Sequence, residues 1–403
     1  MSGLRDVHLL KKMKRSINTI FDKLVHPEFS LGGRSWSCFQ VCGGAGLVLA
    51  IVLMLTLAAL SGLSVYVMAA MVVADLLACL TLAMITKIIL GEERLTYCHH
   101  EIAMILVTVA LSWVLDQPIL SYIDVSILGL GLGLACGRVG CLMAGCCHGR
   151  PSRWGVCYGA EHVAAGFSPY YAGTRFFPVQ IVESMWVGGI VIIGCLLVVG
   201  GYPAGMATAL YICAYGTGRF LLEFVRADTD RAYLGGFSES QWLSLVLMSA
   251  VALGEFLGIL PFQWWHVAAT ALVSLTMLAV AVRRQLQSDT GYQLLLPRHI
   301  DEIAQALDSI SNHADNNGAG PRHRSRRPGI PIDCTSLGVQ ISAGRIKVAG
   351  SYLDHYALSH RTANMTQASA KALARLILQL RHPSGRSNLI AGNRGVFHLL
   401  VAP

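Results

Sequence analysis

The residues best suited to chemistry lie in three short stretches of an otherwise apolar chain. The longest runs from Gly137 to Arg150 and combines arginines, several glycines, three cysteines and a histidine. Arg138 directly follows an apolar run, where a charged side chain is costly unless an anion pairs with it. Glycines let a backbone approach a ligand closely and can turn N–H groups toward an anion. We therefore interpret this stretch as a site for the phosphate of a lipid head group.

A second stretch, residues 215–226, places polar side chains along one helix face. Tyr215, Arg219 and Glu223 are each four residues apart, so a helix would stack them. The arginine and the glutamate can simply neutralise each other, because buried charges are normally paired. Alternatively, Arg219 joins Arg138 to give two guanidinium groups, which suit a phosphodiester. The sequence leaves both interpretations open.

A third stretch opens an apolar run with two adjacent histidines, His99 and His100. An imidazole changes charge near neutral pH, so either residue is a candidate general base. The alternative is a pair of histidines at the membrane interface without a chemical role. The sequence does not choose between the two residues.

The composition indicates how these stretches are positioned. Hydrophobic residues make up 54% of the 403 residues, charged residues only 13%, and several apolar runs approach the length of a bilayer crossing. We predict an all-α polytopic membrane protein with about seven to eight transmembrane helices and a small α+β C-terminal appendage. The expected spans are residues 42–62, 64–90, 101–117, 119–137, 179–200, 204–224, 240–260 and 264–282.

Charge and periodicity divide the rest of the chain. Residues 1–40 form a basic segment with an amphipathic pattern typical of a helix lying on an anionic membrane, residues 41–284 hold the spans, residues 285–332 a helix and a basic linker, and residues 333–403 a small α+β domain. The net charge of +8 lies mostly in the two tails, which favours anionic lipid as a partner, and we expect no nucleic acid. Within the C-terminal part we expect helices at 297–311 and 366–382 and strands at 337–350 and 394–402.

From about residue 40 to 260 the chain resembles the prolipoprotein diacylglyceryl transferase family. That resemblance implies a multi-pass enzyme of the bacterial plasma (inner) membrane that needs no cofactor. Its partners would be phosphatidylglycerol or a related anionic phospholipid, and a lipoprotein precursor with a lipobox cysteine, whose thiol receives the diacylglyceryl group while glycerol phosphate leaves. The resemblance rests on Gly137-Arg138-x-Gly140, Gly145 and Gly149-Arg150, on Pro178-x-Gln180-Ile181-x-Glu183, on Tyr215-Gly216-x-x-Arg219-x-x-x-Glu223-Phe224-x-Arg226, on Ser240-Gln241-x-x-Ser244, and on His99 and Asp124.

The resemblance also implies roles for individual residues. Two arginines would hold the phosphate, and one of the adjacent histidines would take the proton of the acceptor thiol. A thiol with a pKa of about 8.5 is a poor nucleophile at neutral pH, and a histidine with a pKa of about 6.5 is suited to deprotonate it. The expected catalytic residues are His99, His100, Arg138, Arg219, Tyr215 and Glu223, and the expected substrate-binding residues are Arg138, Gly140, Cys141, Gly149, Arg219 and Arg226.

Three positions depart from the family signature, which has amide side chains at Cys141 and Ala144 and a carboxylate at Cys146. They leave open the same scaffold acting on a different lipid or acceptor, or a non-catalytic membrane protein that senses thiols or metals. Cysteines at this density can hold zinc, but the adjacent Cys146 and Cys147 suit one tetrahedral ion poorly, so we expect no metal. Disulfides and free thiols are the alternatives for the cluster Cys141, Cys146, Cys147, His148 and Cys157.

The orientation in the membrane stays open. Lysine and arginine are abundant in the tails and near the three stretches, so the positive-inside rule places this face in the cytoplasm. The family resemblance places the same face outside.

Overall fold

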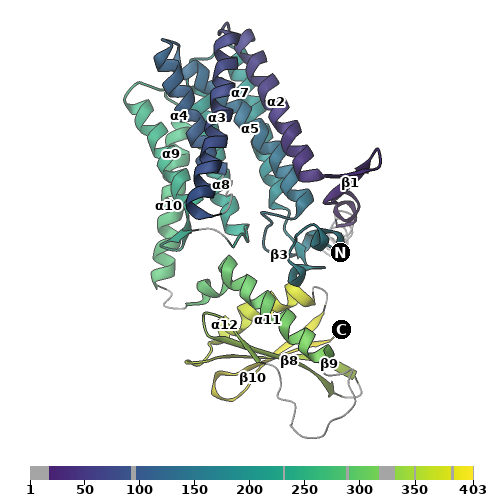
Figure 1. Cartoon of the computed structure of the whole chain (residues 1–403). Coiled ribbons are helices and arrows are strands. Elements are labelled where there is room, and N and C mark those ends of the chain that lie inside the picture. Colours follow the sequence, from purple (N-terminus) through teal and green to yellow (C-terminus); the bar gives the residue numbers. More distant parts are fainter. Residues whose placement is uncertain are drawn as a thin grey trace, which may run out of the picture.

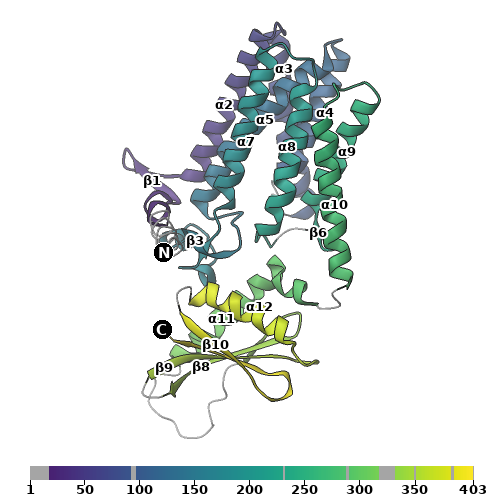
Figure 2. The same ribbon diagram turned by 180° about the vertical axis from the view of Figure 1, so that it is seen from behind.

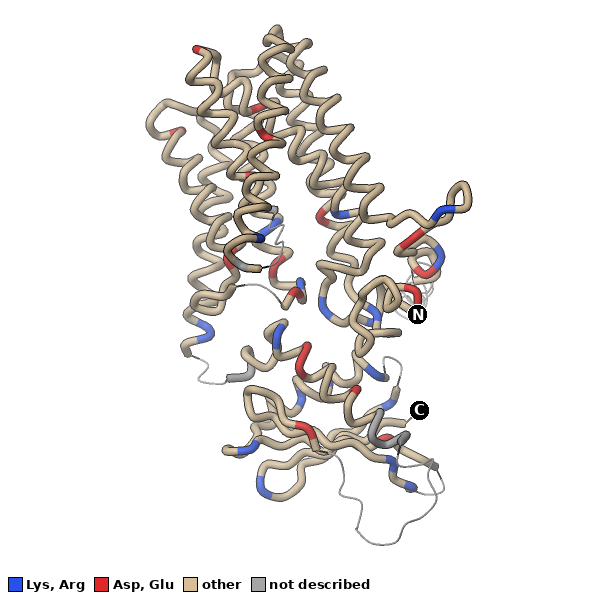
Figure 3. Tube along the Cα trace, viewed as in Figure 1, with Lys and Arg blue, Asp and Glu red and all other residues tan. Residues whose placement is uncertain are grey.

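The computed structural model describes residues 18–91, 97–229, 232–286, 290–316, 332–348, 351–382 and 385–402. Long helices form a bundle at one end of the molecule, and a smaller α+β domain lies at the other (Figures 1 and 2). Lysine and arginine gather in the domain and in the half of the bundle that faces it, whereas the charged residues drawn in the far half of the bundle are acidic (Figure 3).

Helices occupy the positions of all eight expected spans. Within the described residues, five of them (α2, α3, α5, α7 and α10) are long and apolar enough to cross a membrane, judged by length and composition. The total of seven to eight spans stays a prediction. The bundle consists of α2 (Cys38–Leu60), α3 (Val65–Leu90), α4 (Tyr97–Val114), α5 (Ile119–Ala144), α7 (Val179–Val199), α8 (Met206–Leu222), α9 (Glu239–Phe256) and α10 (Trp264–Leu286).

Helix α5 is the most enclosed of the five candidate spans, with 61% of its most apolar window buried. Its glycines permit this burial: a Cβ on Gly129 would lie 2.4 Å from Met54 of α2, and one on Gly131 would lie 2.6 Å from Tyr211 of α8. The helix continues to Ala144, so the expected end at residue 137 is wrong. No proline interrupts the segment, and the helix stops where Gly145 adopts a left-handed φ of 84°.

Asp124 of α5 faces protein, as expected for a carboxylate inside an apolar helix. Its oxygens accept hydrogen bonds from the backbone N–H of Gly205 at 2.7 Å and from the N–H and hydroxyl of Thr208 at 2.7 and 2.6 Å. These groups belong to the first turn of α8, whose N–H groups lack helical partners. Asp124 therefore fixes the start of α8 against α5.

The segment between α5 and α7 is more ordered than the loop expected there. It contains strand β3 (Pro151–Cys157), helix α6 (Ala160–Ala164), the 3-10 turn η1 (Pro169–Tyr171) and strand β4 (Arg175–Phe176), which pairs with β3. Shorter elements are the hairpin β1 (Glu28–Leu31) and β2 (Arg34–Ser37), the turn η2 (Glu223–Val225), and the hairpin β5 (Tyr233–Leu234) and β6 (Phe237–Ser238). Residues 18–24 are helical, and the rest of the expected amphipathic helix lies outside the described residues.

The C-terminal domain is a five-stranded antiparallel sheet in the order β10-β11-β9-β8-β7. Two helices cover the face of the sheet that is turned toward the bundle (Figures 1 and 2). Both expected helices and both expected strands are present, and the basic linker lies mostly outside the described residues. The elements are η3 (Thr290–Leu295), α11 (Pro297–Asn316), β7 (Ile332–Cys334), β8 (Val339–Val348), β9 (Ser351–His360), α12 (Gln367–Arg381), β10 (Arg386–Ala391), η4 (Asn393–Gly395) and β11 (Phe397–Ala402).

The domain contacts the end of the bundle that carries the three polar stretches. Tyr170 donates its hydroxyl to Asp301 of α11 at 2.8 Å, and Thr174 donates its hydroxyl to the carbonyl of Leu380 of α12 at 3.1 Å. Apolar side chains of α11, α12 and the segment before α7 join in one core cluster. The domain is therefore packed against the segment that follows Arg138 in the chain.

Candidate active site

The centre of the polar cluster is Glu183 on α7, whose side chain has 0% exposure. Its Oε2 lies 3.0 Å from Arg138 Nε on α5 and 2.8 Å from Arg226 Nη1. Its Oε1 accepts a hydrogen bond from the hydroxyl of Tyr215 at 3.0 Å and lies 3.7 Å from Arg219 Nη1, both on α8. A buried carboxylate is tolerated only with such compensation. One side chain thus joins the chemistry-bearing residues of separate helices.

Two of the arginines have a further acid. Arg219 Nη2 lies 3.1 Å from Glu223 Oε2, and Arg226 donates from Nε and Nη2 to Asp228 Oδ2 at 3.0 and 2.7 Å. For Arg138, by contrast, Glu183 is the one acidic side chain within ion-pair distance among the described residues. A guanidinium has five N–H donors, so one shared carboxylate leaves capacity for another anion.

A large cavity borders this cluster. Its volume is about 1180 Å³, and Arg138, Tyr215 and Arg219 line it together with both adjacent histidines. Leucines of α3, α4 and α9 form another part of the wall. Pockets for drug-sized ligands measure roughly 300–1,000 Å³, so this space is large enough for a ligand of at least that size. The two expected phosphate ligands therefore meet beside open space.

The adjacent histidines differ in their surroundings. His99 is half-exposed, and its Nε2 lies 2.6 Å from Oε1 of Glu239 at the start of α9. His100 is buried, with 4% exposure. Glu101, the next residue, also lines the cavity. A carboxylate beside an imidazole orients the ring, so the His99–Glu239 pair has the arrangement of an oriented base.

Two of the expected binding residues, Gly140 and Gly149, lie close to neighbouring segments of the protein. The N–H of Gly149 donates to the carbonyl of Phe177 at 3.2 Å, and a Cβ on Gly149 would lie 2.5 Å from that oxygen. A Cβ on Gly140 would lie 3.1 Å from Cys42 Cβ on α2. The Gly149 N–H thus has a hydrogen-bond partner within the protein, and both glycines allow close packing of neighbouring segments. Their expected role in substrate binding stays a prediction.

Arg226, another expected binding residue, is almost inaccessible at 1% exposure. Burial alone would lower the pKa of Arg226, but Asp228 and Glu183 outweigh this and raise it. Its backbone pairs with Gly149, and the N–H of Arg150 donates to the carbonyl of Val225 at 2.8 Å. The surroundings of Arg226 are those of a residue that ties the segment after α5 to the end of α8.

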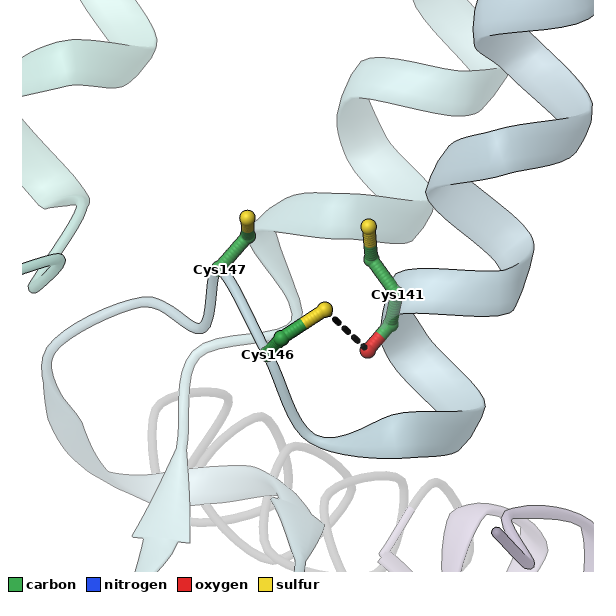
Figure 4. Close-up of side chains that lie close together, drawn as sticks. All are labelled: Cys141, Cys146 and Cys147. Carbon is green, nitrogen blue, oxygen red and sulfur yellow. Dashed lines mark hydrogen bonds between the residues drawn. The ribbon is translucent and has the colours of Figure 1, made fainter. Parts of the chain in front are cut away.

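Three of the clustered cysteines come together. The Sγ atoms of Cys141, Cys146 and Cys147 all lie within 4.8 Å of one another (Figure 4). His148 is not part of this group: its Nδ1 is hydrogen-bonded with the Gly149 carbonyl at 2.9 Å, and its ring centroid lies 4.2 Å from that of Phe176. Burial lowers the pKa of His148, which keeps the ring neutral. Cys146 and Cys147 line the cavity.

Sequence reasoning gave no role to Glu183, although it named the residue within the segment Pro178–Glu183. The available signal was its isolation: Glu183 is the one charged residue between positions 179 and 200. An ionisable residue inside an apolar span predicts a partner or a function. The partner arginines, however, come from other helices, so no local pattern identifies them.

Comparison with known proteins agrees with this architecture. The family model described as prolipoprotein diacylglyceryl transferase matches residues 37–257. The phosphatidylglycerol–prolipoprotein diacylglyceryl transferase 2 of Clostridium perfringens (strain 13 / Type A) is 33% identical over 135 residues, which are 32% of this chain and 49% of that protein. A phosphatidylglycerol–prolipoprotein diacylglyceryl transferase of Dehalococcoides mccartyi (strain CBDB1) is 35% identical over 137 residues, covering 34% and 50%. The chain thus spans about half the length of the curated relatives that it matches. With more than half of its residues matched by the family model, the chain belongs to the prolipoprotein diacylglyceryl transferase family.

Proposed function

We propose that the protein transfers a diacylglyceryl group from phosphatidylglycerol to the thiol of a lipobox cysteine in a lipoprotein precursor. The carbon–oxygen bond to the phosphate breaks, a carbon–sulfur bond forms, and glycerol phosphate leaves. One observation carries the proposal: Arg138 and Arg219, from two helices, converge on Glu183 at the wall of one large cavity. The relatives named above are phosphatidylglycerol–prolipoprotein diacylglyceryl transferases, which supports the same reaction.

Arg138 and Arg219 would stabilise the leaving phosphate. Negative charge accumulates on this group as the carbon–oxygen bond breaks, and fixed guanidinium groups in a low-dielectric site lower the energy of that state. Glu183 holds both arginines in place before substrate arrives, which reduces the cost of ordering two long side chains. The hydrogen bond from Tyr215 fixes the carboxylate in turn.

His99 or His100 would accept the proton of the acceptor thiol. Both residues line the cavity, and the contact of His99 with Glu239 supports it as the stronger candidate. A positioned histidine contributes typically 10²–10⁴-fold to such a step, as an order of magnitude. The imidazolium formed would be stabilised by the glutamate.

The apolar part of the cavity would take the acyl chains. Leu82, Leu106 and Leu247 come from three helices and line the side formed by α3, α4 and α9. A multi-pass protein of the bacterial plasma membrane, with α4, α8 and α9 completing seven to eight spans, would place this wall within reach of lipid. The donor would then reach the arginines without leaving the bilayer.

A transfer assay tests the proposal. Purified full-length protein in phosphatidylglycerol-containing vesicles is incubated with a peptide that carries a lipobox cysteine, and the peptide mass is followed. We expect the peptide to gain one diacylglyceryl group, and a peptide with serine in place of the cysteine to gain none. Absence of transfer by a correctly inserted protein, or equal transfer from phosphatidylcholine vesicles, would contradict the proposal.

A further inference from the structure

Three thiols converge at the end of α5. Cys141 lies in the last turns of the helix, and Cys146 and Cys147 follow directly after its cap. Their sulfur atoms are mutually within 4.8 Å, and no other group of three possible metal ligands this close is found among the described residues. Figure 4 shows the three side chains around one space between the end of α5 and the segment that follows it.

The backbone explains why adjacent cysteines meet a third one. Gly145 has φ 84° and Cys147 has φ 54°, so the chain turns back twice within three residues. A left-handed φ is uncommon for a residue with a side chain. The turns bring Cys146 and Cys147 over the helix end, with the Cys146 thiol 3.9 Å from the carbonyl oxygen of Cys141. Adjacent cysteines were expected to suit one tetrahedral ion poorly, but these turns bring both thiols to the same place, so that objection no longer applies.

We propose that Cys141, Cys146 and Cys147 bind one zinc ion, with the fourth coordination position open to the cavity. Zinc–thiolate bonds of about 2.3 Å place the sulfurs of a tetrahedral site about 3.8 Å apart. The observed separations, all within 4.8 Å, need only small side-chain rotations to reach this geometry. Each thiol releases its proton to solvent on binding, so the site forms more readily as the pH rises.

Two guanidinium groups lie close to one of the three thiols. Arg138 and Arg226 are both near enough to Cys147 to attract its thiolate. Three thiolates and one Zn²⁺ carry a net charge of −1, and the two guanidinium groups that attract it also face Glu183. Cys146 and Cys147 belong to the cavity wall, so an exogenous fourth ligand such as water or a small thiol has access. The inference stands on the geometry of the thiols and does not depend on the proposed transferase activity.

Metal binding by the full-length protein tests the inference. Detergent-purified protein is reduced, stripped with a chelator, and titrated with Zn²⁺, or with Co²⁺ to follow the absorption of cobalt–thiolate bonds. We expect one equivalent per chain and a spectrum typical of tetrahedral sulfur ligation. Single substitutions Cys141→Ser, Cys146→Ser and Cys147→Ser should each weaken binding by at least about 10-fold, the smallest loss caused by altering even a supporting residue of a metal site.

Two control variants distinguish zinc binding by the trio from binding elsewhere and from loss of the fold. Cys157→Ser, which changes a thiol of the same segment outside the trio, should bind zinc like the unaltered protein. The triple Cys→Ser variant should elute and unfold like the unaltered protein while binding no zinc at this site. Reduced protein that binds no zinc, a disulfide within the trio that resists reduction, or a triple variant that retains the ion would each overturn the inference.

Discussion

Arg138 Nε and Glu183 Oε2 lie 3.0 Å apart, on two helices that the apolar pattern predicts separately. The contact has two consequences. It compensates a carboxylate with 0% exposure, and it holds the guanidinium of Arg138 at the wall of the cavity. Because the same carboxylate also contacts Arg219, Arg226 and Tyr215, Glu183 sets the positions of all four side chains.

Tyr215→Phe should slow transfer while the protein stays folded. The substitution removes the hydrogen bond to Glu183, and such a bond to a charged group is worth about 1.5–3 kcal/mol. We expect a rate lower by roughly 10- to 100-fold, mainly in kcat, in the vesicle assay. Tyr202→Phe, which changes an exposed tyrosine in the turn between α7 and α8, is the control and should leave the rate unchanged. Equal transfer rates for both variants would contradict a role of the Tyr215 hydroxyl in the reaction.

His99→Gln and Glu239→Gln should each lower the transfer rate, and their effects should not add in the double variant. If Glu239 acts by orienting His99 across the 2.6 Å contact, the double variant should be about as slow as His99→Gln alone. Transfer rates of the two single variants and the double variant measure this coupling. An unchanged rate for His99→Gln, combined with a strong loss for His100→Gln, would assign the base to the buried histidine instead.

Gly149→Ala should destabilise the protein, because its Cβ would lie 2.5 Å from the carbonyl oxygen of Phe177. Gly159→Ala is a matched control on the same segment, since nothing lies within 4 Å of its Cβ position. We expect a lower midpoint of thermal unfolding in detergent for Gly149→Ala and little change for the control. Similar midpoints, with a selective loss of phosphatidylglycerol binding by Gly149→Ala, would restore the anion-binding role.

The C-terminal domain should lose stability below neutral pH. Burial lowers the pKa of His299, and also those of His355 and His382. As the pH falls through about 6.5, these histidines bind protons in the unfolded chain but not in the folded domain. The free energy of unfolding is therefore highest above that pH and decreases as the pH drops through it. Amide exchange in α11, corrected for its intrinsic pH dependence, should be faster at pH about 5.5 than at 7.5. His299→Gln should flatten the difference; unchanged protection in the unaltered protein at both pH values would contradict the linkage.

Apolar runs predicted the bundle well because a helix that faces lipid needs an uninterrupted apolar sequence. The same reasoning placed the end of α5 too early, at residue 137, because it treated Arg138 as a boundary. In the folded chain Glu183 compensates Arg138, so the helix continues for two more turns to Ala144. Charge in a sequence marks a boundary only when no partner is available.

The C-terminal sheet was only partly predictable. Strand β8 begins with alternating apolar and polar residues and β11 is a mostly apolar run, whereas β9 places Tyr352, Asp354 and His355 among its apolar positions. Asp354 falls on the same face of β9 as the buried Tyr356 and Leu358, which interrupts the period of two on which prediction relies. The convergence of Cys141, Cys146 and Cys147 also escaped prediction, since it depends on the left-handed turn at Cys147.

The central claim is that Arg138 and Arg219 together hold the phosphate of the lipid donor. The most direct measurement is diacylglyceryl transfer by Arg138→Gln and Arg219→Gln in phosphatidylglycerol vesicles, with Arg283→Gln, on the last turn of α10, as the control. Either change removes a positive charge beside the buried carboxylate of Glu183, which can destabilise the fold. The double variant Arg138→Gln/Glu183→Gln removes that carboxylate as well, so a loss of transfer in this variant is not caused by an unpaired buried charge. We predict a loss of at least about 100-fold for both single variants, in line with removal of one preorganised charge-stabilising donor, with the control unaffected. Transfer at the unaltered rate by both folded variants would contradict the account.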